Sequence, residues 1–150
     1  MLDEASIYFN KVIERSEDVH DLHVAVQALK DLAGQGCTKA QEYLGMYYQG
    51  DWAVLRLEEH NILQEDDELS VYWFEKAVNG GSTYAMTCLG SHYEDDFDDV
   101  KAEYWYKRAV QEGGGIDAIE ELINYYFRDG RDDKVAELCK EYGLDIQNFL

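Results

Sequence analysis

The hydrophobic positions of the chain recur three and four residues apart, which predicts helices rather than strands. Apolar side chains follow this spacing throughout residues 2–16. A second apolar stripe covers residues 24–33 and is followed by Gly34 and Gly36, which are expected to end that helix. We therefore predict that residues 1–36 form a pair of helices.

Two later segments repeat each other. The sequence VYWFEKAVNGG at residues 71–81 returns as EYWYKRAVQEGG at residues 103–114. Ala85 and Ala118, which follow the two copies, lie 33 residues apart. A fixed period of this size predicts stacked repeats, each of which buries one face against its neighbour.

The helix that opens each repeat carries the same small and large apolar residues at the same spacing. Because this spacing places them on one helical face, they are expected to form the buried seam between neighbouring helices. They are Ala40, Leu44, Gly45 and Tyr48 in the first repeat, Ala85, Leu89, Gly90 and Tyr93 in the second, and Ala118, Leu122 and Tyr126 in the third, where Ile123 replaces the glycine.

The combined pattern is A-x3-L-G-x2-Y, then D-x6-W-[FY]-x2-A, then a glycine turn. It resembles the Sel-one-like repeat (SLR) family, a relative of the tetratricopeptide repeats. The match is strong over residues 40–114, weaker over 118–142, where the second helix lacks Trp, and faint before residue 40. The resemblance implies an all-α fold, a right-handed superhelical α-solenoid of about four antiparallel helix pairs. It also implies that the chain binds other proteins.

On this basis the chain is expected to be one repeat domain. Its parts are a divergent helix pair at 1–36, repeats at about 37–81, 82–114 and 115–142, and a C-terminal cap at 143–150. The segment from 50 to 70 is longer than its counterpart in the next repeat and holds several apolar residues, Trp52 among them. It is predicted to cover the neighbouring helices or to bind a partner, and its apolar content argues against disorder.

Charge narrows the choice of partner. The chain has 13 Lys and Arg against 32 Asp and Glu, a formal net charge of −19. Such a charge argues against nucleic acid and anionic membranes and favours a protein with a basic surface. The alternative is that the charge only keeps the protein soluble. Three scattered cysteines, without a visible secretory signal or membrane span, favour a cytoplasmic location.

The candidate binding face is the side of each opening helix that points away from its buried stripe. In the related repeats this face lines a concave groove that holds ligands. Met46, Tyr84 and Phe127 are expected to be exposed there, the alternative being that they pack on adjoining helices. The predicted partner-binding residues are Glu42, Met46, Gln49, Tyr84, Thr87, Ser91, Glu94, Glu120, Asn124 and Phe127, with Trp52 from the long segment.

Candidate chemistry is sparse. Cys88 and His92 stand four residues apart, but two ligands are too few for a zinc site. The acidic run at 94–99 lacks the glycine of a calcium loop. It is expected to cap the next helix through Asp96 or Asp98, or to dock a basic partner. We predict no catalytic, cofactor-binding or metal site.

The leading expectation is a non-catalytic protein-binding module. Small free-standing proteins that resemble these repeats include bacterial immunity proteins, so this chain is predicted to bind and neutralise a basic toxin or effector. The alternative is a cytoplasmic scaffold or adaptor that recognises a peptide or a helix in its groove. A monomer or a weak homodimer is expected.

Overall fold

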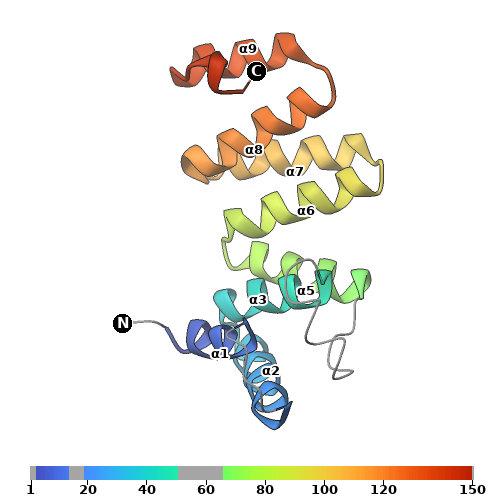
Figure 1. Cartoon of the computed structure of the whole chain (residues 1–150), viewed down its shortest axis with the longest axis vertical. Helices are drawn as coiled ribbons and strands as arrows, with labels where there is room; N and C mark the ends of the chain where they lie inside the picture. Colours follow the sequence, from blue (N-terminus) through green and yellow to red (C-terminus); the bar gives the residue numbers. More distant parts are fainter. Residues whose placement is uncertain (1–2, 14–18, 51–65, 150) are drawn as a thin grey trace. The chain divides into compact units, whose positions relative to one another are not determined.

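The computed structural model describes residues 3–13, 19–50 and 66–149, which are helical and contain no strand (Figure 1). The predicted all-α class is confirmed. The elements are α1 (Glu4–Ile13), α2 (Val19–Gly34), α3 (Thr38–Gln49), α5 (Asp67–Asn79), α6 (Thr83–Asp95), α7 (Asp99–Gln111), α8 (Gly115–Arg128), α9 (Asp132–Tyr142) and a short 3-10 helix, η1 (Ile146–Asn148).

The chain divides into two compact units, which we call the N-terminal unit (Met1–Ala85) and the C-terminal unit (Met86–Leu150). The division falls inside α6. Helices that follow each other in the chain pack together, α1 on α2, α2 on α3 and α3 on α5 in the N-terminal unit, and α7 on α8 and α8 on α9 in the C-terminal unit. This packing of consecutive helices is consistent with a helical repeat.

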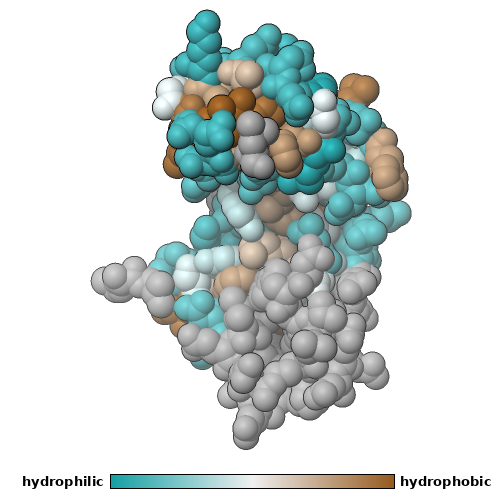
Figure 2. All heavy atoms as spheres, turned by 45° about the horizontal axis from the view of Figure 1, so that its top comes forward, coloured by the Kyte–Doolittle hydropathy of each residue, from teal (hydrophilic) through white to brown (hydrophobic). Residues whose placement is uncertain are grey.

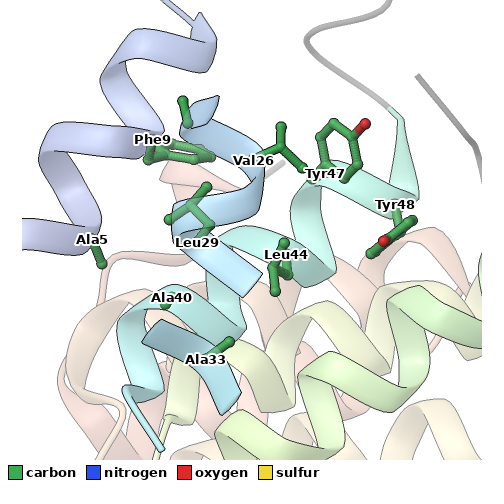
Figure 3. Close-up of a cluster of buried hydrophobic side chains, with 10 residues drawn as sticks. Ala5, Phe9, Val26, Leu29, Ala33, Ala40, Leu44, Tyr47 and Tyr48 are labelled. Atoms are coloured by element: carbon green, nitrogen blue, oxygen red, sulfur yellow. The ribbon is translucent and has the colours of Figure 1, made fainter. Parts of the chain in front are cut away.

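The core of the N-terminal unit lies among α1, α2 and α3. Phe9, Leu29 and Leu44, one from each helix, lie in the space between them (Figure 3). Phe9 stacks on Tyr43 with ring centroids 3.7 Å apart. Alanines at positions such as 33 and 40 are fully buried, which lets the helix backbones approach closely.

Tyrosines dominate the core of the C-terminal unit. Tyr106, Tyr125 and Tyr126 are each at most 2% exposed. The rings of Tyr106 and Tyr125 lie 5.2 Å apart, which joins α7 to α8. Val135 and Cys139 bring α9 onto the same cluster.

The same turn follows α2, α5 and α7. Gly36, Gly81 and Gly113 each adopt a left-handed backbone, with φ of 90°, 90° and 88°. The next N–H donates back to the carbonyl five residues earlier, as from Ser82 to Ala77 at 3.0 Å. Side chains with a Cβ disfavour this conformation, so the glycines fix where each helix ends.

Aspartates begin the partner helices. Asp66 Oδ1 accepts the Leu69 N–H at 2.9 Å, and Asp98 Oδ1 accepts the Lys101 N–H at 3.1 Å. The predicted capping by Asp98 is therefore confirmed. Each cap stands seven residues before a tryptophan, which gives the Asp-to-Trp spacing of the repeats a physical cause.

Candidate protein-interaction site

The first predicted binding residue, Glu42, is engaged inside the N-terminal unit. Its side chain accepts hydrogen bonds from Ser82 Oγ at 2.6 Å and from Lys39 Nζ at 2.7 Å. Only 6% of the residue is exposed. This differs from the expected open face, because the turn between α5 and α6 places Ser82 over this side of α3. Ser82 Oγ in turn accepts the Ala85 N–H at 2.9 Å, so the cluster holds the start of α6.

Met46 and Tyr84 are brought together on the surface of the same unit. The Tyr84 hydroxyl lies 3.6 Å from the Met46 sulfur. Tyr84 is 47% exposed, whereas Met46 and Gln49 are half-buried. A sulfur beside an aromatic ring makes a polarizable apolar surface, of the kind enriched at protein interfaces.

Glu94 of the C-terminal unit is also engaged. Its two carboxylate oxygens accept from Arg128 Nε at 2.7 Å and Nη2 at 2.8 Å, and the Tyr106 hydroxyl donates to it at 3.0 Å. The Arg128 hydrogen bonds lower the pKa of Glu94. Arg128 already balances the charge of Glu94. The Glu94 carboxylate therefore holds Arg128 of α8 in place and is not free to bind a partner's cation.

A set of outward-facing residues on α8 remains open. We call it the α8 face, and its members are Ile116, Glu120, Asn124 and Phe127. Phe127 is 42% exposed and Ile116 is 48% exposed, while Asn124 is half-buried. Ile116 was not predicted, although its position four residues before Glu120 places it on the same side of the helix. Thr87 and Ser91, on α6, are half-buried.

The C-terminal unit keeps most of its basic side chains in internal ion pairs. Three acidic residues of α8, by contrast, are exposed and form no ion pair with the residues that the structure describes. They are Asp117, Glu120 and Glu121. Figure 2 shows hydrophilic residues over most of the coloured surface of this unit on the face in view, with hydrophobic residues between them. The paired bases are Lys101, Lys107, Arg108, Arg128, Arg131 and Lys134.

A polar cluster around Glu103 fixes the position of α8. The Glu103 carboxylate accepts from Tyr126 Oη on α8 and from Arg131 Nη1, just before α9, each at 2.8 Å. Partial burial raises the pKa of Glu103, but hydrogen bonds from Lys107, Arg131 and Tyr126 outweigh it and bring the pKa from 4.5 to about 2. The carboxylate therefore stays charged and ties α7, α8 and α9 together.

Trp52 lies outside the described residues, but the two ends of its segment are described. The Asp66 N–H donates to the Tyr48 carbonyl at 3.0 Å. The short turn between α6 and α7 closes with the same hydrogen bond, from Asp98 to Tyr93 at 2.8 Å. The longer segment between α3 and α5 is therefore an insertion. The residues at its two ends are joined by the same hydrogen bond as the ends of the short turn, and this preserves the pairing of α3 with α5.

Within the described ranges, no group of three or more His, Cys, Asp or Glu side chains is placed to hold a metal ion. His92 Nε2 lies 3.5 Å from an oxygen of Asp96, an ordinary contact within one turn of helix. The described surface of the C-terminal unit therefore offers a ligand carboxylates and aromatic rings.

None of the helices in the described part of the chain combines the length and apolar character needed to cross a membrane. Comparison of the chain with protein-family models, with curated proteins and with solved structures found no match. Membership of the SLR family therefore stays a prediction from the repeated residues.

Proposed function

We propose that this protein is a non-catalytic module that binds another protein with a basic surface, and that the α8 face is a principal contact. The observation that carries the proposal is the composition of this face. Phe127 and Ile116 are exposed beside the carboxylates of Asp117 and Glu120, which form no ion pair with the residues that the structure describes.

The two kinds of side chain have different roles in binding. Exposed aromatic residues anchor an interface when they enter a pocket on the partner. Surplus carboxylates favour approach of a positively charged surface and penalise a negative one, so they contribute to association rate and specificity. A net charge of −19 extends that preference over the whole chain.

The more specific form of the proposal is an immunity or inhibitor protein that neutralises a basic toxin or effector in the cytoplasm. In this form the helix pairs stack as a right-handed SLR-type solenoid, and the protein acts as a monomer or a weak homodimer. The three cysteines, which are free thiols, are compatible with a reducing compartment. A gene for a secreted toxin next to the gene for this protein would support this form.

An adaptor that recognises a peptide is the second candidate, and the Met46–Tyr84 contact favours it. This surface is apolar and lies on a different unit from the α8 face. Binding there would depend on shape and apolar area, and it would change little with salt.

A selection from a displayed random-peptide library distinguishes the two candidates. Selected peptides are synthesised and their affinities measured by fluorescence anisotropy at ~0.05 M and ~0.5 M NaCl, where the screening length falls to a few ångströms. We expect Lys- and Arg-rich peptides whose affinity falls at least about tenfold at the higher salt. Peptides without basic residues, or affinities that do not change with salt, would contradict the electrostatic proposal.

Matched variants locate the contact. Asp117→Asn with Glu120→Gln removes two charges from α8. Asp133→Asn with Glu141→Gln removes two from α9 as a control, since these two carboxylates are also exposed and form no ion pair in the described chain. Phe127→Ala is compared with Tyr142→Ala, since the two rings are 42% and 40% exposed. We expect the α8 variants alone to weaken binding, by about tenfold or more. Equal effects of the α8 and α9 variants would exclude the α8 face.

A further inference from the structure

Phe97, in the turn between α6 and α7, has a backbone conformation that phenylalanine rarely adopts. Its φ is +58°, the only positive value at a non-glycine position in the described residues. The left-handed conformation brings Cβ too close to the backbone, which disfavours every side chain of this kind.

Another turn with the same hydrogen bonds shows what this position requires. Between α8 and α9, Gly130 has φ of +70° and donates to the Phe127 carbonyl at 3.1 Å. Phe97 donates to the Glu94 carbonyl at 3.0 Å in the same way. The two turns share their hydrogen bonds, so glycine suits the backbone at position 97 and phenylalanine strains it.

The side chain has no packing role that would offset this strain. Phe97 is 91% exposed, and Val100, three residues later, is 82% exposed. An exposed aromatic residue in a strained conformation therefore stabilises nothing within the fold, and observed strain of this kind is concentrated at functional positions.

Acidic side chains surround this apolar pair and restrict what it can meet. Asp95 and Asp99 are exposed and form no ion pair among the described residues. Asp96 contacts His92, and Asp98 caps α7 and pairs with Lys101 at 3.0 Å. A second copy of this acidic chain, an anionic membrane or a nucleic acid would be repelled here.

We propose that Phe97, supported by Val100, is an anchor that inserts into an apolar pocket rimmed by Lys or Arg side chains on another protein. The ring supplies apolar area, and the flanking aspartates meet the basic rim. Phenylalanine is kept where glycine would fit the backbone better because the ring is used in binding. This contact goes beyond the α8 face and does not require it.

A small host with the same chemistry tests the anchor directly. The probe is a β-cyclodextrin whose rim carries ammonium groups, since it has an apolar cavity with a basic edge. Neutral β-cyclodextrin is the comparison ligand. We expect the cationic host to bind at least about tenfold more tightly than the neutral one. We also expect amide chemical-shift changes confined to residues 95–100.

Two variants remove the ring without imposing a new backbone conflict. Phe97→Gly and Phe97→Asn, both compatible with a left-handed residue, are expected to abolish the chemical-shift changes. Tyr104→Ala is the control, because Tyr104 is an exposed ring on α7, at 54%. Phe97→Gly should also raise Tm, by ~2–6 °C.

Three results would overturn the anchor. They are binding that persists in both Phe97 variants, equal affinity for the neutral and cationic hosts, and a Tm that falls in Phe97→Gly. Phe127→Ala should leave host binding at the turn unchanged, so failure of the α8 face and failure of the anchor are distinguishable.

Discussion

Gly90 of α6 lies directly against the ring of Tyr106 of α7. A Cβ atom on this glycine would come within 2.9 Å of two ring carbons, closer than Cβ atoms approach non-bonded neighbours in folded proteins. Gly45 has the same relationship to Phe74, at 2.6 Å. After α7 the pattern changes on both sides of this contact. Ile123 of α8 replaces the glycine, and Cys139 of α9, which lies 33 residues after Tyr106, replaces the large ring with a small buried side chain.

The first prediction concerns this contact. Gly90→Ala should destabilise the protein by about 1–3 kcal/mol, because the added methyl group overpacks a ring that is only 1% exposed and whose hydroxyl is bonded to Glu94. The gain in helix propensity from glycine to alanine, at most ~1 kcal/mol, is too small to compensate. Urea unfolding followed by circular dichroism measures the change.

Gly34→Ala is the matched control for that substitution. Gly34 is also a helical glycine, the last residue of α2, but a Cβ there would meet nothing within 4 Å. We expect this variant to be as stable as the parent or more stable, by up to ~1 kcal/mol. If both alanine variants changed stability equally, packing against Tyr106 would not explain the glycine.

The second prediction concerns the two related turns. Gly130→Ala should lower the free energy of unfolding by about 1 kcal/mol, because Gly130 has φ of +70°. Phe97→Gly should raise it by a similar amount, since it relieves the same backbone conflict. Opposite signs in denaturant unfolding are the expected outcome, and equal signs would show that the two turns are not equivalent.

The third prediction concerns pH. The folded-state pKa of Glu103, about 2, lies below its usual 4.5, so this group stabilises the fold above pH 4.5 and the contribution is lost as the pH falls toward 2. Glu103→Gln should therefore cost about 1 kcal/mol near pH 7, less than the full shift implies because water screens the site. Near pH 3 the variant and parent should be closer in stability.

Glu141→Gln is the control for the pH series, since Glu141 is exposed on α9 and forms no ion pair within the described chain. Its stability should follow that of the parent at each pH. A Glu103→Gln penalty that stayed constant from neutral to acidic pH would mean that loss of shape or hydrogen bonding, rather than charge, is responsible.

The fourth prediction concerns the buried carboxylate of Glu42. Ser82→Ala removes its hydrogen bond at 2.6 Å and also the acceptor for the Ala85 N–H. We expect a loss of about 2 kcal/mol, because a buried acceptor and a helix start both lose a partner. Thermal unfolding measures it, and Gln35→Ala, in the exposed turn after α2, should have little effect.

The candidate site could be predicted only in part. Phe127 and Tyr84 are exposed, as their position relative to the buried stripe indicates. Glu42 lies on the same side of its helix, yet Ser82 covers it. The helical period states which way a side chain points along one helix, but not what the next turn of the chain places over it.

The sequence by itself determined the helices, their caps and their turns. Asp98 begins α7 and Gly81 separates α5 from α6 through interactions that span only a few residues, so local side-chain chemistry decides them. Only the tertiary structure decided that Glu42 is enclosed and that Phe97 stands in solvent on a strained backbone. Burial depends on which residues meet from distant parts of the chain, and backbone strain persists only where the surrounding fold holds it in place.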